Sequence, residues 1–110
     1  MQNNSDKKKF ELRTTISLKE IQTSSHTDFH ELLKKTIYEA SANYPAVKAF
    51  FVRYIPRESK IIVGLRIEKS SDDGIENIAD ALIRDGLETA LGQFGNHNRA
   101  VIEESELTLT

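Results

Sequence analysis

The sequence contains no cysteine, and this absence excludes several kinds of site. Without a thiol, the chain cannot form a disulfide, bind a metal through thiolates or use a cysteine nucleophile. A zinc site would have to combine carboxylates with some of the three histidines. His26 and His30 lie four residues apart in the stretch HTDFHE, but we expect His26 to precede the first turn of a helix and this region to be solvated instead of holding a metal. We therefore predict no metal and no cofactor.

Long apolar runs are also missing. The first residues, MQNNSDKKKFELR, include basic side chains, but no apolar stretch of the length that a signal peptide needs follows them. No stretch approaches the roughly 20 apolar residues that a membrane-spanning helix requires. We therefore expect a cytoplasmic protein that does not contact a membrane.

Motifs for catalysis or nucleotide binding are missing too. The segment SSDDG at residues 70–74 lacks the ligand spacing of a calcium loop, and we expect it to cap a helix instead. The glycines after residue 85 follow no strand and lack the GK[ST] ending of a phosphate loop. The glutamates of the final stretch have no recognisable partner for acid–base chemistry. Whether the chain is an enzyme stays open at this point, and we expect that it is not.

What the sequence does contain fits one globular domain with unevenly distributed charges. It has 110 residues, of which 38% are hydrophobic and 29% are charged. Residues 1–66 contain 12 basic and 7 acidic side chains, a formal charge of +5, whereas residues 67–110 contain 3 and 10, a charge of −7. The net charge of −2 therefore hides two parts of opposite sign.

Hydrophobic periodicity divides the chain into helices and strands. Apolar residues at every second position predict strands, and apolar residues at three- and four-residue spacing predict helices. We interpret residues 1–9 as a flexible lead-in and residues 10–110 as a single domain. A β-bulge near Glu103 and Glu104 would restore the alternation of the last strand. The expected elements are a strand at 10–18, a helix from Thr27 or Asp28 to before Pro45, a hairpin at 48–69, a helix at 75–94 and a strand at 99–110.

The order strand, helix, strand, strand, helix, strand resembles the ferredoxin-like split β-α-β arrangement. This resemblance covers residues 10–110 and implies an α+β fold with a four-stranded antiparallel sheet of order 4-1-3-2. Both helices would cover the same face of this sheet, leaving the other face, which we call the open face, uncovered. Because this superfold hosts many functions, the resemblance implies no activity.

The hairpin decides which side chains point to the open face. Its sequence, KAFFVRYIPRESKIIVGLRIEK, contains two adjacent phenylalanines, and only one of them can enter the core. A four-residue loop at 56–59 places Phe50 in the core and Phe51 on the open face, opposite Gly64. A five-residue loop would reverse the faces and bury Arg53 without a partner, so we favour the shorter loop.

The open face is the predicted functional surface. Its apolar side chains suggest self-association as a homodimer or larger homo-oligomer, through an interface of Phe51, Ile55, Ile62 and Gly64. An alternative is a module that senses a small anionic ligand through Arg13, Arg53 and Arg66. Binding of single-stranded nucleic acid is disfavoured, because the third strand lacks aromatic residues and the chain is acidic overall.

The two edge strands of the predicted sheet differ in charge. The last strand is acidic, whereas the second strand and its turn are basic: the residues are Glu103, Glu104 and Glu106 on one side, and Lys48, Arg53, Arg57 and Lys60 on the other. Complementary edges would favour head-to-tail contacts between copies. The same charges could instead only prevent edge-to-edge aggregation, and the sequence leaves both interpretations open.

Overall fold

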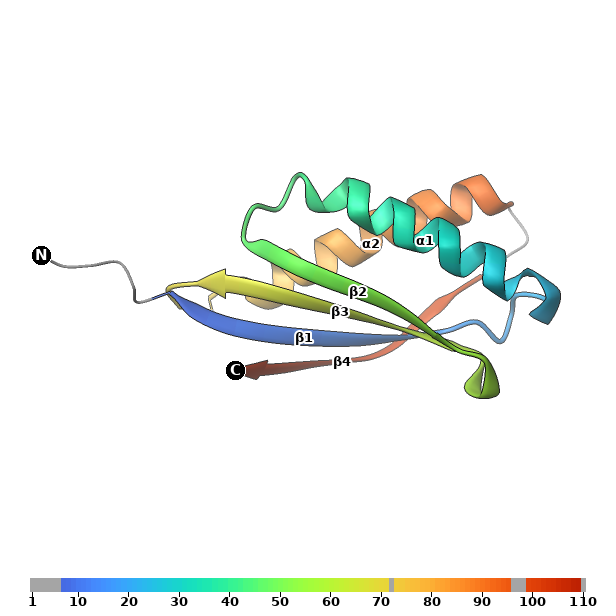
Figure 1. Cartoon of the computed structure of the whole chain (residues 1–110), viewed down its shortest axis with the longest axis horizontal. Helices are drawn as coiled ribbons and strands as arrows, with labels where there is room; N and C mark the ends of the chain where they lie inside the picture. The colour runs from blue at the N-terminus through green and yellow to red at the C-terminus, as the bar shows by residue number, and fades with distance from the viewer. Residues whose placement is uncertain (1–6, 72, 96–98, 110) are drawn as a thin grey trace, which may run out of the picture.

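The computed structural model describes residues 7–71, 73–95 and 99–109 (Figure 1). The strands and helices follow one another along the chain in the predicted order. Their order is β1 (Lys8–Ser17), η1 (Thr23–Ser25), α1 (His26–Ser41), β2 (Val47–Ile55), η2 (Pro56–Glu58), β3 (Lys60–Lys69), α2 (Ile75–Phe94) and β4 (Val101–Leu109).

The four strands form one antiparallel sheet of order β2-β3-β1-β4, which is the predicted order read from the other edge. Both helices lie on the same face of this sheet, and the other face is uncovered (Figure 1). The predicted ferredoxin-like α+β fold is therefore confirmed. β1 begins at Lys8, two residues before the expected start at Phe10. None of the helices in the described part of the chain is long and apolar enough to cross a membrane.

The core lies between the sheet and the two helices. Phe29 and Ile37 of α1 and Leu82 of α2 are fully buried there, because the apolar stripe of each amphipathic helix faces the sheet. Gly86 lets the helices approach closely: a Cβ atom at this position would lie 2.7 Å from Cδ1 and 3.3 Å from Cα of Ile37. The Thr36 hydroxyl donates a 2.7 Å hydrogen bond to the Gly86 carbonyl across this contact.

The hairpin has the predicted register. Phe50 pairs with Leu65, and Phe51 pairs with Gly64. Pro56 starts the 3₁₀ turn η2, and Ser59 closes the loop in the left-handed conformation, with φ of 52°. The four-residue loop therefore sends Phe51 to the open face, and Phe50 becomes half-buried on the helix-covered face.

Two other local predictions have different outcomes. The bulge in β4 is confirmed, because the pairing with β1 shifts by one residue at Glu103. The expected side-chain cap before α2 is wrong: Gly74 occupies the N-cap with φ of 76°, and no side-chain cap hydrogen bond is formed by the described residues there. Asp72, part of the same predicted cap, lies outside the described residues.

Candidate functional site: the open face and the α2–β4 cleft

The open face is arranged in rows of side chains that cross the sheet from β2 to β4. Residues paired across antiparallel strands point to the same face, so the strand registers define these rows. In order they are Ala49, Arg66, Glu11, Thr108; then Phe51, Gly64, Arg13, Glu106; then Arg53, Ile62, Thr15, Glu104; and finally Ile55, Lys60, Ser17, Val101.

The Phe51 ring covers Gly64, its partner on β3. A Cβ atom at Gly64 would overlap the Phe51 ring, so the ring occupies the space that a side chain at position 64 would need. The guanidinium carbons of Arg13 and Arg53 lie 5.9 Å and 5.4 Å from the centre of this ring. Cations at this distance are attracted by the face of an aromatic ring. Phe51 is therefore half-buried, with Gly64 beneath it and two cations beside it.

The three predicted ligand-binding arginines fall into two groups. Arg13 and Arg53 flank Phe51, and Arg13 also lies 3.6 Å from the Glu11 carboxylate. Arg66 instead lines a shallow hollow of about 160 Å³ on the other side of Phe51. Glu11 and Gly64 line the same hollow, so a carboxylate shares it with the arginine.

The predicted interface residues are less exposed than an uncovered apolar patch would be. Phe51, Ile55 and Ile62 are half-buried, and Gly64 is buried. The sequence-based prediction missed Val101, which lies at the β4 end of the last row and is 48% exposed. The side of the sheet to which Val101 points depends on where the bulge in β4 lies. The alternating pattern of the strand does not locate this bulge to one residue. Apolar side chains thus lie at both ends of this row.

His26 corrects the expectation of a solvated histidine pair. It is only 1% exposed and is the first residue of α1, directly after η1. Nε2 lies 3.0 Å from the Leu18 carbonyl oxygen and 2.8 Å from the Ile21 carbonyl oxygen, so it carries the proton and donates. Nδ1 lies 3.1 Å from the Tyr54 hydroxyl and accepts a hydrogen bond from it. One tautomer satisfies all three contacts, and His26 is a buried structural residue.

His30 is held separately from His26. Its Nε2 donates a 2.9 Å hydrogen bond to the carbonyl oxygen of Val52 in β2. Its Nδ1 lies 3.6 Å from the Glu31 carboxylate. Within residues 7–71, 73–95 and 99–109, no group of three or more His, Cys, Asp or Glu side chains is arranged to hold a metal ion.

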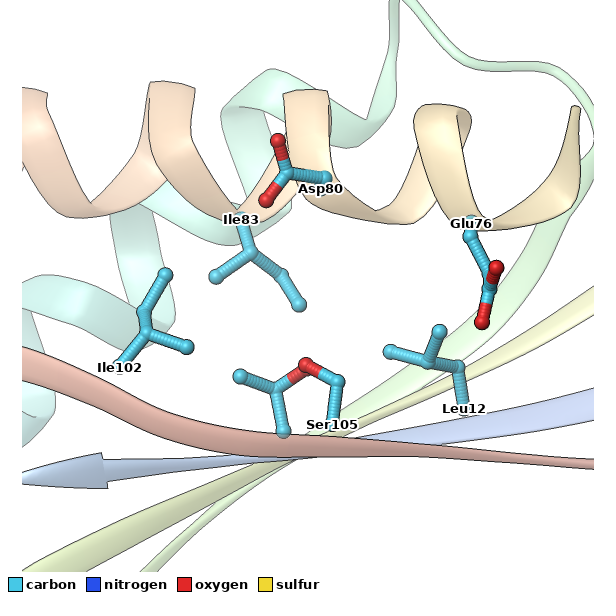
Figure 2. Close-up of a pocket in the computed structure, with 7 residues that line it drawn as sticks. Leu12, Glu76, Asp80, Ile83, Ile102 and Ser105 are labelled. Atoms are coloured by element: carbon cyan, nitrogen blue, oxygen red, sulfur yellow. The ribbon is translucent and has the colours of Figure 1, made fainter.

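A cleft of about 160 Å³ lies on the opposite, helix-covered side of the sheet, between α2 and the strands β1 and β4 (Figure 2). We call it the α2–β4 cleft. Apolar and polar side chains line it together: Leu12, Thr14, Glu76, Asp80, Ile83, Ile102 and Ser105. The sequence-based prediction did not identify this cleft.

Hydroxyl groups form the floor of the α2–β4 cleft, and carboxylates line its helix side. The Oγ1 atom of Thr14 lies 2.8 Å from the Oγ atom of Ser105. Thr14 is 1% exposed, whereas Ser105 on the edge strand is open to solvent. On α2, Arg84 donates a 2.8 Å hydrogen bond to Asp80, and this bond raises the pKa of the guanidinium above its usual value. Glu76 lies one helical turn before Asp80 and extends toward Leu12 (Figure 2).

No family model matches the chain, and no curated protein matches it in sequence. Solved structures do resemble it in shape. One from Chloroflexus aurantiacus, named provisionally as an antibiotic biosynthesis monooxygenase, is 13% identical over 93% of this chain and 92% of its own, with a TM-score of 0.54. A NIPSNAP-family protein of unknown function from Agrobacterium tumefaciens is 17% identical over 100% and 92%, with a TM-score of 0.46.

An uncharacterized protein from Thermotoga maritima is 13% identical over 94% of this chain and 96% of its own, with a TM-score of 0.43. Likeness at such low identity shows a shared backbone arrangement and not a shared activity. What the chain has in common with the Chloroflexus protein is therefore its fold, a ferredoxin-like α+β arrangement across nearly its whole length.

Proposed function

We propose that the chain is a non-enzymatic, cytoplasmic interaction domain in which two copies pack their open faces together as a homodimer. The observation that carries this proposal is the gradient of polarity along the rows. The two central rows begin at β2 with Phe51 and Arg53 and end at β4 with Glu106 and Glu104. Such a surface is complementary to a reversed copy of itself.

A two-fold axis parallel to the strands provides this reversal. It places β2 of one copy over β4 of the other, so each row faces the same row running in the opposite direction. Arg53 then faces the partner's Glu104, and Arg66 faces the partner's Glu11. Ile55 faces the partner's Val101, which brings the apolar ends of the last row together. The charged edges are thereby used within a closed dimer instead of the head-to-tail contacts that the sequence suggested.

The other face-to-face arrangement is disfavoured by charge. A two-fold axis perpendicular to the strands would place β4 over β4 of the partner. Glu104 and Glu106 of both copies would then approach each other, and like charges brought together at an interface are destabilising. The distribution of acids on β4 therefore selects the first axis.

The size of the open face is sufficient for a modest dimer interface. Four strands of nine or ten residues, spaced by about 4.8 Å and rising about 3.3 Å per residue, give a face of about 600 Å². Two such faces bury about 1,200 Å², the lower end of the range for specific interfaces. We therefore expect a dimer that dissociates on dilution.

The molar mass in solution tests the proposal. We expect wild type to be a dimer and Phe51→Glu to be a monomer, because a carboxylate at this position would face the partner's Glu106. Tyr38→Glu is the matched control, because Tyr38 is 68% exposed on α1 and lies outside the open face. It should leave the dimer intact. A wild-type monomer at the highest soluble concentration would overturn the proposal.

A charge reversal tests the axis. Arg53→Glu and Glu104→Arg should each weaken the dimer, and the double variant should restore it. Within one chain these side chains stand on opposite edges of the sheet, three strand spacings or about 14 Å apart. Rescue must therefore come from contacts between two copies. Absence of rescue would exclude the axis parallel to the strands while leaving dimerisation itself to the mass measurement.

The hollow beside Arg66 supports the alternative of a module that senses a small anion. Phosphate or a small carboxylate would then raise the Tm of wild type but not of Arg66→Ala. A monomeric wild type that shows this shift would favour the ligand-sensing function over self-association.

A further inference from the structure

The α2–β4 cleft has the chemistry of a binding site for a small organic cation. We propose that it binds a primary amine with an apolar body about the size of a six-membered ring. The cleft lies on the helix-covered side of the sheet (Figure 2), so the proposed dimer interface on the open face does not cover it.

The apolar walls set the size of the ligand. Leu12, Ile83 and Ile102 line the cleft from β1, α2 and β4. Its volume of about 160 Å³ is close to that of a protein cavity of about 150 Å³ that accommodates benzene. A ring or a chain of similar volume can therefore fill the space between the helix and the strands.

The hydroxyl pair on the floor leaves a polar group available to a ligand. Thr14 and Ser105 together possess four acceptor lone pairs on their hydroxyl oxygens, and the bond between them uses one, so these oxygens can still accept a hydrogen bond from a ligand. Their helix-facing neighbours in the strand pairing are apolar: Leu12 pairs with Leu107 on one side, and Ile16 pairs with Ile102 on the other. The strand side of the cleft is thus apolar except at Thr14 and Ser105, which provide its polar groups.

The carboxylates set the charge of the ligand. Glu76 and Asp80 lie four residues apart and therefore face the same side of α2, where both line the cleft. Arg84 compensates one of these charges through its bond to Asp80. The cleft therefore retains an excess negative charge beside an apolar wall. An ammonium group satisfies this charge and donates to carboxylate and hydroxyl oxygens, as neither an alcohol nor a carboxylate ligand does.

Three probes of matched shape test this assignment: 2-phenylethylamine, the uncharged 2-phenylethanol and the anionic 3-phenylpropanoate. Titration into isotopically labelled protein, followed by NMR, gives both the affinity and the location. We expect the amine to bind about tenfold more tightly than the alcohol, the difference that one charge-assisted hydrogen bond supplies. Its shifts should centre on Thr14, Ile83 and Ser105, and the propanoate should not bind.

Two charge-matched variants separate the site from general electrostatic attraction. Glu76→Gln should remove the preference for the amine over the alcohol. Glu88→Gln changes the net charge equally, on an exposed carboxylate of α2 that does not line the cleft, and should keep the preference. The proposal would be overturned if the amine and the alcohol bound with equal affinity, or if both variants lost the preference for the amine equally. It would also be overturned if the NMR shifts centred elsewhere or if no probe bound. Because these readouts do not measure molar mass, their failure is distinct from failure of the dimer.

Discussion

The two helices cover the two halves of the sheet in different ways. Over β2, α1 meets large side chains, and its histidines bond directly to the strand: His26 to the Tyr54 hydroxyl and His30 to the Val52 carbonyl oxygen. Over β1 and β4, α2 meets the small polar pair of Thr14 and Ser105, and the α2–β4 cleft remains between the helix and these strands. On the helix-covered side, the half with α1 and β2 is closely packed, which we call the sealed half, whereas the half with α2 and β4 contains the cleft.

The difference shows that side-chain volume, and not backbone topology, decides where this fold has room for a ligand. Both edge strands have nine residues, and both run antiparallel to the neighbouring strand. Interiors are close-packed, so replacing a pair of large apolar residues by Thr and Ser leaves a space unless the helix moves inward. Gly86 lets α2 lie close to α1 at Ile37.

The largest loss of stability is expected from substituting His26, which joins α1 to β2 in the sealed half. His26→Ala leaves a cavity and removes the side-chain donor of two carbonyl oxygens, of which the Leu18 oxygen keeps its bond from the Ile21 amide, so the free energy of unfolding should fall by about 3 kcal/mol. Denaturant unfolding measures this loss. His30→Ala is the control, because His30 is half-buried, and the loss of its bond to Val52 should lower stability by about 1 kcal/mol. Equal small losses for both variants would contradict the structural role of His26.

A smaller effect is expected at the contact between the two helices. Gly86→Ala should destabilise the protein by about 1 to 2 kcal/mol, because the new methyl group meets Ile37. Gly92→Ala is matched to it on the same helix, where no heavy atom lies within 4 Å of an added Cβ. That variant should be stabilised by up to about 1 kcal/mol, since alanine favours the helix more than glycine does. Thermal unfolding of both variants would show opposite shifts, and shifts of the same sign would exclude the close contact.

The smallest effect is expected at an exposed link between the two halves. The Tyr44 hydroxyl donates a 3.0 Å hydrogen bond to Asp85 on α2, and this bond, with the charge of Asp85, raises the pKa of Tyr44. A folded-state pKa raised above the unfolded value favours the folded state at pH values below the unfolded pKa of about 10, and this contribution is lost as pH rises further.

Asp85→Asn should therefore lower the pKa of Tyr44 toward the ordinary tyrosine value. Ultraviolet absorbance during an alkaline titration measures this change, and Tyr44→Phe identifies which tyrosine is responsible. An unchanged titration curve in Asp85→Asn would show that the hydrogen bond does not form in solution.

Much of the fold followed from local patterns in the sequence. The periodicity of α2 predicted its limits, Ile75–Phe94, because an uninterrupted apolar stripe leaves few alternatives. The hairpin register followed from the length of one loop and from the cost of burying Arg53, and the structure has that register. These predictions succeeded because each depended on neighbouring residues alone.

The remaining features depend on contacts between distant residues. The partners of His26 are two backbone carbonyl groups and one distant hydroxyl, and no side-chain pattern near residue 26 indicates them. The α2–β4 cleft requires Ser105 to face α2, which follows only once the bulge at Glu103 is located. Thr14 was the one visible signal, as a polar residue in the apolar alternation from Phe10 to Leu18.

The bulge at Glu103 gives β4 a double role. Beyond it, Glu104 and Glu106 point to the open face, while Ser105 between them points to the α2–β4 cleft. A partner copy and an amine would thus contact the two opposite faces of one edge strand. In the sheet this strand is hydrogen-bonded to β1. If either binding event restricts the motion of β4, it favours the other event, and thermodynamic linkage requires the two effects to be equal. A single strand could in this way transmit the occupancy of a ligand site to the state of assembly.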